Sequence, residues 1–272
     1  MKGCKQMIKL GVNSVLFKTI DFPTAAAQIA KCGYDGVEIS AIEGMCEHLD
    51  VYNWRDQKET LLSAVKDNGL SFLSTEMATH NRDRLLHGFE ACAELGIPVV
   101  NIGPGGAMND EESFKQISEE IQQISEDAEK FGITLCVKAH VGGAVWNTPT
   151  TLRLMETVTS PAFGVDMDPS HIHRSGENPV EAIREVLPKM KHIHIRDCTG
   201  AGPAPGTPEL QICGTGEIDL FGYFREMVNA GYDGPVSLEV IGPDRDITDA
   251  TLIAAESYGY MNAILRSLGA RK

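Results

Sequence analysis

Charged and imidazole side chains recur at every second position of several short β-rich segments in this 272-residue chain. In segment 192–197, positions 193 and 195 are isoleucine, whereas His192, His194 and Arg196 take the positions before, between and after them. Successive side chains of a strand point to opposite faces, so one face of this segment is apolar and the other is charged. Buried charges are costly unless they are paired or bound to metal. The pattern therefore predicts a polar pocket that several strands share.

The same alternation in the other segments gives a set of inward-facing polar residues: Glu38, Lys138, Asp168, His194, Arg196 and Glu239. Asp168, His194 and Glu239 come from three consecutive segments, and two carboxylates with an imidazole suit a hard-to-borderline divalent ion. His171 follows Asp168 by three residues, just past the strand, where it could bind metal or substrate. The alternative is an internal network of ion pairs without chemistry. We expect a metal-centred site at the C-terminal ends of the strands.

Eight β-rich segments can hold these residues in place: 8–13, 35–40, 71–75, 99–103, 134–140, 163–168, 192–197 and 235–241. Helical stretches lie between them and one follows the last, and this strict alternation indicates a parallel sheet. We therefore expect an α/β fold, a single (β/α)8 TIM barrel that forms one domain over residues 1–272. An open doubly wound sheet is the alternative, which the missing glycine fingerprint after the first strand disfavours.

The clearest helix is predicted over 111–131, where apolar residues recur at spacings of three and four. Asp110 can cap its start and Gly132 its end. A second long helix is predicted over 252–268. The longest irregular stretch is 199–217, which is rich in glycine and proline, and loops of this length tend to be functional or mobile.

Composition limits the classes of partner. The 24 lysine and arginine residues against 38 aspartate and glutamate residues give a net charge of −14, which disfavours nucleic acid and anionic membranes. The seven cysteines are odd in number and include no Cys-x-x-Cys pair, so we expect reduced, mostly buried thiols. The first ten residues are too polar for a signal-peptide core, and no apolar run is long enough for a membrane helix. A cytoplasmic location is expected.

Four motifs resemble the sugar phosphate isomerase/epimerase superfamily, the xylose-isomerase-like barrels that are related to endonuclease IV. They are Phe163-Gly-Val-Asp-Met-Asp168-Pro-Ser-His171, His192-Ile-His194-Ile-Arg-Asp197, Gly214-Thr-Gly-Glu-Ile-Asp219 and Gly231-Tyr-Asp-Gly-Pro-Val-Ser-Leu-Glu239. Val37-Glu38 also fits. The resemblance spans essentially the whole chain and is strongest from about Thr134 onward.

This resemblance implies a divalent metal, Zn, Mn, Mg or Fe, held by residues of four consecutive strands. Three of the positions map onto Asp168, His194 and Glu239. The fourth is commonly the glutamate of Glu-Asn-His, whereas this chain reads Lys138-Ala139-His140. His140 could replace the missing ligand. Lys138 could act as a base with a lowered pKa, could bind a substrate carboxylate or phosphate, or could pair with Glu239 or Asp168 in a barrel without metal.

The function that the resemblance implies is a metal-dependent isomerase or epimerase of a sugar, a sugar phosphate or a related polyhydroxy compound. Proton transfer would take place beside a metal-polarised carbonyl. Glu239 and Lys138 are the catalytic candidates, and the substrate-binding candidates are His171, Arg174, Arg196 and Glu38. The alternatives are a lyase or dehydratase on the same barrel and a non-catalytic sugar-binding barrel, which the replaced glutamate motivates. The expected partner is a small-molecule sugar, and association into a homo-oligomer stays open.

Overall fold

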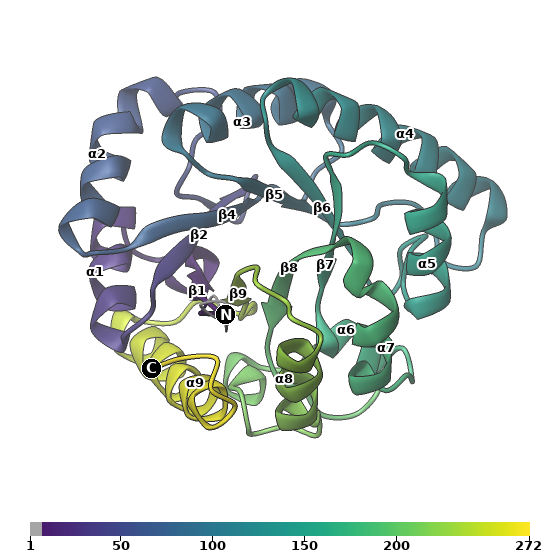
Figure 1. Ribbon diagram of the computed structural model, residues 1–272. Coiled ribbons are helices and arrows are strands. Elements are labelled where there is room, and N and C mark those ends of the chain that lie inside the picture. The colour runs from purple at the N-terminus through teal and green to yellow at the C-terminus, as the bar shows by residue number, and fades with distance from the viewer. Residues whose placement is uncertain (1–6) are drawn as a thin grey trace, which may run out of the picture.

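The computed structural model describes residues 7–272, which form a closed barrel of parallel strands surrounded by helices (Figure 1). Neighbouring strands pair in the order β1-β2-β4-β5-β6-β7-β8-β9, and β9 pairs with β1 to close the barrel. The parallel strands are β1 (Leu10–Asn13), β2 (Gly36–Ile42), β4 (Ser71–Glu76), β5 (Val99–Ile102), β6 (Thr134–Lys138), β7 (Phe163–Met167), β8 (Met190–Ile195) and β9 (Val236–Leu238). This confirms the predicted (β/α)8 TIM barrel.

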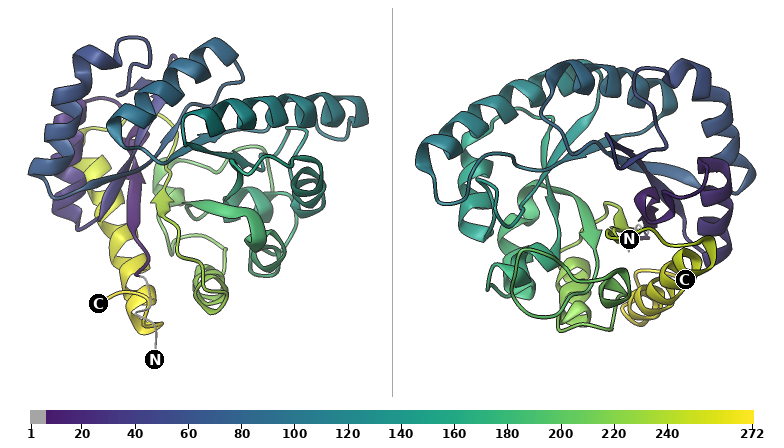
Figure 2. Two further views of the ribbon diagram at one scale, coloured as in Figure 1. Left: turned by 45° about the horizontal axis from the view of Figure 1, so that its top comes forward. Right: turned by 180° about the vertical axis from the view of Figure 1, so that it is seen from behind.

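Helices cover the outside of the barrel, as the two views of Figure 2 show. They are α1 (Phe22–Cys32), α2 (Trp54–Asp67), α3 (Arg82–Leu95), α4 (Glu111–Lys130), α5 (Thr148–Thr157), α6 (Pro169–Arg174), α7 (Pro179–Val186), α8 (Leu220–Asn229) and α9 (Ile247–Ser267). Two helices, α6 and α7, lie between β7 and β8, where the sequence predicts one helical stretch. A short strand, β3 (Cys46–Glu47), pairs antiparallel with the end of β2.

The helix boundaries follow from local capping. The start of α4 is the predicted one, because the side chain of Asp110 accepts a hydrogen bond from the backbone N–H of Ser113 at 3.0 Å. Beyond its end, Gly132 adopts a positive φ of 71°, which a glycine tolerates without strain. Helix α9 starts five residues before the predicted 252–268, because Asp246 caps the backbone N–H groups of Thr248 and Asp249.

Strand β8 shows how the alternation of side chains divides the interior. Ile193 and Ile195 are fully buried in the hydrophobic core. His192 and His194 are equally buried, but they contact the carboxylates of Glu38 on β2, across the barrel, and of Asp166 on the neighbouring strand β7. The predicted division into an apolar outer face and a polar inner face is therefore confirmed for this strand.

The long stretch 199–217 is held against the barrel by specific polar contacts. The carboxylate of Asp197 accepts hydrogen bonds from the backbone N–H groups of Gly214 at 3.0 Å and Ile218 at 3.2 Å. A Cβ atom at Gly216 would lie 2.3 Å from this carboxylate, so the position requires glycine. The side chain of Gln211, in the 3-10 segment η3 (Pro208–Gln211), joins the stretch to the backbone of Ile241. The Gly214-Thr-Gly-Glu motif thus anchors a loop beside the barrel mouth.

The six cysteines of residues 7–272 are free thiols, and five of them are buried. This agrees with the prediction of reduced, mostly buried thiols, and Cys4 lies outside the described residues. Within the same range, the structure contains no helix that combines the length and the apolar character needed to span a membrane.

The substitution Ile193→Ala tests whether the apolar residues of β8 stabilise the fold by packing on the outer face of the sheet. The side chain is completely buried, so its removal leaves a cavity and should lower the free energy of unfolding by about 2–5 kcal/mol. Chemical denaturation measures this loss. A change of only about 0.5 kcal/mol, typical of a surface position, would contradict the assignment.

Candidate active site

The floor of the site is a closed box of two histidines and two carboxylates. His194 lies 2.5 Å from Glu38 through Nε2 and 2.5 Å from Asp166 through Nδ1. His192 bridges the same carboxylates at 3.1 and 2.9 Å. All four side chains are completely inaccessible to solvent. Each ring nitrogen therefore faces a carboxylate oxygen and has no open side.

Charge pairing explains how this box can be buried. Burial raises the pKa of Glu38 and of Asp166, but the neighbouring histidines outweigh it and hold both pKa values well below their usual range. Burial likewise lowers the pKa of His194, but Asp166 and Glu38 raise it well above its usual value. The pKa of His192 is raised for the same reason. The histidines and the carboxylates thus favour each other's charged forms.

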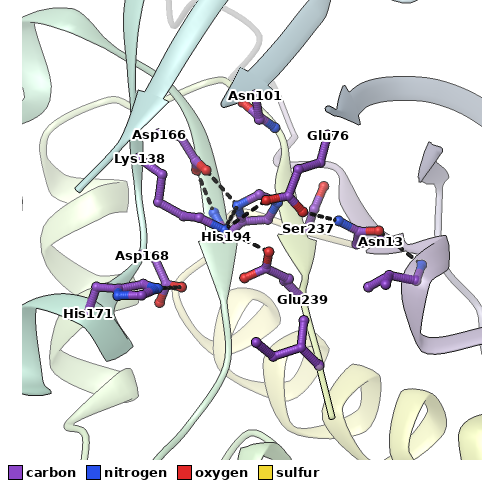
Figure 3. Close-up of polar contacts among 12 residues, drawn as sticks. Asn13, Glu76, Asn101, Lys138, Asp166, Asp168, His171, His194, Ser237 and Glu239 are labelled. Carbon is purple, nitrogen blue, oxygen red and sulfur yellow. Dashed lines mark hydrogen bonds and ion pairs between the residues drawn. The ribbon is translucent and has the colours of Figure 1, made fainter. Parts of the chain in front are cut away.

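Above this floor, the ammonium group of Lys138 is the centre of a second cluster. Lys138 Nζ donates to Glu239 Oε1 at 2.6 Å and to Glu76 Oε1 at 3.1 Å. It also lies 3.2 Å from Nδ1 of His194. Figure 3 shows these side chains converging from strands β4, β6 and β8 and from the end of β9. The lysine is 4% exposed, so the contacts form almost out of reach of water.

The structure bears on the alternatives that the sequence leaves open for Lys138. Burial disfavours its ammonium form, but Glu239 and Glu76 outweigh burial and raise the pKa of Lys138. The direction of this shift is opposite to the one that a base at this position would need, and the contact with Glu239 is the ion pair that the sequence analysis gives as another alternative. The carboxylate of Glu239 has its pKa held well below the usual range: burial opposes this, but Lys138 and Arg196 prevail.

Arg196 provides the second buried cation. Its Nη2 donates to Asp168 Oδ2 at 2.8 Å, and its Nη1 lies 2.8 Å from Glu239 Oε2. The latter contact is an ion pair without hydrogen-bond alignment, because both of its atoms lack a hydrogen-bond partner. Glu239 Oε2 is therefore buried without a hydrogen bond, and cations flank the carboxylate on two sides.

These groups open on a cavity of about 430 Å³ at the mouth of the barrel. Its polar lining includes Glu76, Lys138, His140, His171, Arg196 and Glu239. The glycine-rich segment 103–106 forms part of its wall, together with the apolar side chains of Ile42, Met45 and Ile241. The volume suits a small organic molecule.

Glu76 is a residue of the cavity lining that the sequence analysis missed. It is the last residue of β4, one position beyond the predicted segment 71–75. Its parity is that of Ser74, whose hydroxyl donates to Glu38, so the alternation rule would have found it in a longer strand. Burial and the adjacent Glu239 raise the pKa of Glu76 to about 8, and Lys138 opposes the shift. At neutral pH the site thus holds one protonated and one ionised carboxyl group.

Two of the predicted substrate-binding residues lie outside the lining of the cavity. Glu38 does not line the cavity; it is fully buried and accepts hydrogen bonds from Asn13 and Asn101 at 2.6 and 2.7 Å. Arg174 does not line the cavity either, because its guanidinium binds the backbone oxygens of Pro203 at 2.8 Å and Gly202 at 3.3 Å. Both side chains are committed to structural contacts.

His171 and Arg196 do line the cavity, and His140 lies beside them. The rings of His140 and His171 are 4.1 Å apart between centroids. Burial, followed by the adjacent Arg196, lowers the pKa of His171 well below its usual value, so the ring is neutral. Of the four predicted ligands, the structure brings His194 and Glu239 together. Asp168 is paired with Arg196, and His140 lies on the wall of the cavity.

Residues 26–264 match the family model of the xylose isomerase-like TIM barrel. The chain belongs to this family. The match extends over most of the barrel and confirms the resemblance that the sequence motifs carry.

Two solved structures have the same fold over nearly the whole chain. The probable 3-DHS dehydratase AsbF of Bacillus anthracis has a TM-score of 0.78 at 16% identity, over 94% of this chain and 99% of that chain. A D-tagatose 3-epimerase-like protein has a TM-score of 0.76 at 20% identity, over 96% and 98%.

Curated relatives are matched over shorter stretches of the chain. The inosose dehydratase of Bacillus thuringiensis (strain Al Hakam) is 26% identical over 87 residues, which are 32% of this chain and 29% of that protein. The match thus spans less than a third of that relative's length. The inosose dehydratase of Clostridium beijerinckii is 22% identical over 218 residues, or 71% of this chain and 72% of the relative.

Xylose isomerase-like barrels often use divalent metals, and the described residues include two groups whose donor atoms lie within 4.8 Å of one another. One is Glu38, His192 and His194; the other is Glu76, His194 and Glu239. The first is the closed box, in which every ring nitrogen of the two histidines already lies against a carboxylate oxygen. In the second, the ammonium of Lys138 already lies against all three residues. Neither donor set fits a divalent ion in this arrangement.

The substitution Glu76→Gln tests the protonation of Glu76. Between pH 4.5, its usual pKa, and about 8, the folded chain holds a proton here that the unfolded chain has lost. The contribution of Glu76 to stability is therefore complete below pH 4.5 and falls as pH rises through this window. Glutamine does not titrate. The free energy of unfolding of the variant, taken relative to that of the wild type, should therefore rise by about 1 kcal/mol or more from the acidic to the alkaline end of this pH window.

Denaturant unfolding at a series of pH values measures this difference. Glu256→Gln, at an exposed position of α9, is the matched control and should follow the wild-type profile. Parallel profiles for wild type and Glu76→Gln would show that Glu76 is ionised in the folded protein.

Proposed function

We propose that this protein is an enzyme that moves a proton next to a carbonyl group of a small polyhydroxy compound, a sugar, sugar phosphate or related molecule, and thereby isomerises or epimerises it. The observation that carries the proposal is Glu239. Its carboxylate is ionised, lines the cavity and keeps Oε2 without a hydrogen-bond partner. Such a carboxylate is suited to take a proton from carbon when a substrate fills the cavity.

The two cations beside Glu239 can stabilise the negative charge that the reaction creates. Removal of a proton beside a carbonyl places negative charge on the carbonyl oxygen. Lys138 and Arg196 both line the cavity and are fixed in place by buried carboxylates, so their N–H groups need little reorganisation to stabilise that oxygen. His171, neutral and adjacent to Arg196, lies where it can bind a substrate hydroxyl.

Glu76 is the candidate for the second proton transfer. In an isomerisation, protonated Glu76 can give its proton to the enolate oxygen; Glu239 then returns its proton to the neighbouring carbon, and Glu76 takes the proton of the adjacent hydroxyl as the new carbonyl forms. In an epimerisation, Glu76 can instead protonate the same carbon on its other face, which leaves Glu76 ionised and Glu239 protonated. The substrate class is supported by the epimerase-like structural relative and by the size of the cavity. A divalent ion is not part of this proposal, because Lys138 occupies the position among the donors.

A dehydratase is the second candidate, and the acid–base pair is the observation that favours it. In a dehydration, Glu239 would take the proton beside the carbonyl, the carbon–oxygen bond of the next carbon would break, and the hydroxyl would leave as water with the proton of Glu76. Glu76 and Glu239 share the ammonium of Lys138, so acid and base lie close together. The relatives named inosose dehydratase and the probable 3-DHS dehydratase support this candidate.

The proposal is tested by incubating the protein in D2O with a panel of aldoses, ketoses, their phosphates and inososes, followed by NMR. At least one compound should exchange the hydrogen next to its carbonyl for deuterium. Recovery of an isomer or epimer supports the leading function, whereas loss of water supports the dehydratase. Binding of a panel member without exchange or product would instead indicate a sugar-binding barrel.

Glu239→Gln should reduce the exchange rate by about 10²–10⁴-fold, because the amide cannot accept the proton. Glu256→Gln is the control at an exposed position and should leave the rate unchanged. Exchange at the wild-type rate in Glu239→Gln would remove Glu239 from the reaction.

A further inference from the structure

We infer that the ammonium group of Lys138 takes the place of the divalent cation in this barrel, so that the site is complete without a bound metal. Three residues, Glu76, His194 and Glu239, offer ligand atoms close enough to share an ion. Lys138 Nζ contacts the same three, at 3.1, 3.2 and 2.6 Å. The sequence places this lysine where the resemblance implies a glutamate ligand. The single replacement of glutamate by Lys138 therefore removes a metal ligand and adds a cation at the same position.

The surroundings of His194 support this inference independently. Both of its ring nitrogens lie 2.5 Å from carboxylate oxygens, of Glu38 and Asp166. To bind a metal through Nδ1, the ring would have to give up Asp166, which is fully buried and also accepts from the backbone N–H of His194 at 2.9 Å. The histidine is thus held as part of the floor beneath the cluster.

Charge balance leads to the same conclusion. In the upper cluster Lys138 pairs with Glu239 and Glu76, and Arg196 pairs with Asp168 and Glu239. Two buried cations thus already contact these carboxyl groups. A divalent cation would add two further positive charges next to a buried ammonium, which is unfavourable where little water screens them.

The replacement changes what the site can do with a substrate oxygen. An ammonium has three N–H donors, of which two bond to Glu239 and Glu76, so the third can turn toward a carbonyl oxygen in the cavity. It then acts as a hydrogen-bond donor with a full positive charge. This catalytic role rests on the proposed function, whereas the absence of a metal requirement does not.

The direct test measures binding of Mn²⁺, added as the chloride, to the wild-type protein, Lys138→Glu and Lys138→Arg. Free and bound Mn²⁺ are distinguished by electron paramagnetic resonance. Lys138→Glu removes a cation and adds a carboxylate, so it should bind Mn²⁺ at least about tenfold more tightly than the wild type. Lys138→Arg keeps the positive charge and should bind as weakly as the wild type. Tight, stoichiometric binding by the wild type overturns the inference, and so does equal affinity in all three proteins.

Thermal denaturation covers the case in which Lys138→Glu does not fold. Lys138→Met leaves Glu76 and Glu239 without their shared cation, so Mn²⁺ should raise its melting temperature while that of the wild type stays unchanged. A rise in the wild type as large as that in Lys138→Met overturns the inference.

A chelator separates this inference from the proposed function. If the wild type exchanges substrate hydrogen in D2O, the rate should persist in excess EDTA. Exchange that EDTA abolishes and Mn²⁺ restores overturns the role of Lys138 but leaves the proposed reaction intact. Weak Mn²⁺ binding by the wild type, without exchange on any panel compound, supports the inference and contradicts the proposed function.

Discussion

The buried ion pair between Lys138 and Glu239 is the interaction on which the rest of the site depends. An unpaired ammonium in this position would be strongly disfavoured, and so would an unpaired carboxylate. Together they stabilise each other at 2.6 Å and fix the protonation of their neighbours. Glu239 stays ionised because two cations flank it, and Glu76 stays protonated because one more buried negative charge would exceed what Lys138 and Arg196 can balance. The acid–base pair of the proposed reaction follows from that balance.

The barrel holds this arrangement in two layers. The lower layer, the box of His192, His194, Glu38 and Asp166, is sealed from solvent and forms a polar floor beneath the upper layer. The upper layer faces the cavity with groups whose positions are fixed by one another. Outside the sheet, apolar side chains pack against the helices, so the same strands supply both the stability of the fold and the geometry of the site.

Much of this arrangement is encoded in local sequence patterns. The alternation of residues along β8 was enough to predict that His192 and His194 point inward, because the two faces of a strand are fixed by its geometry. The barrel followed from the regular succession of strands and helices. Glu76 was missed since the predicted strand ended at position 75, and strand ends depend on pairing with neighbours that lie far away in the sequence.

Other features depend on contacts that no local pattern reveals. The sign of the pKa shift of Lys138 depends on Glu76 and Glu239, which are 62 and 101 residues away in the chain. Arg174 was predicted to bind substrate because its actual partner could not be foreseen. Its guanidinium binds a backbone oxygen near Pro203, in a loop whose sequence has no regular pattern. The sequence therefore identified which residues share the interior, whereas their charge states and partners required the folded structure.

The most direct test of this account is the anomalous scattering of a crystal grown in the presence of Mn²⁺. The account predicts no anomalous peak between Glu76, His194 and Glu239, with the nitrogen of Lys138 within hydrogen-bond distance of both glutamates. A strong peak at that position, with the lysine side chain turned away from it, would contradict the account.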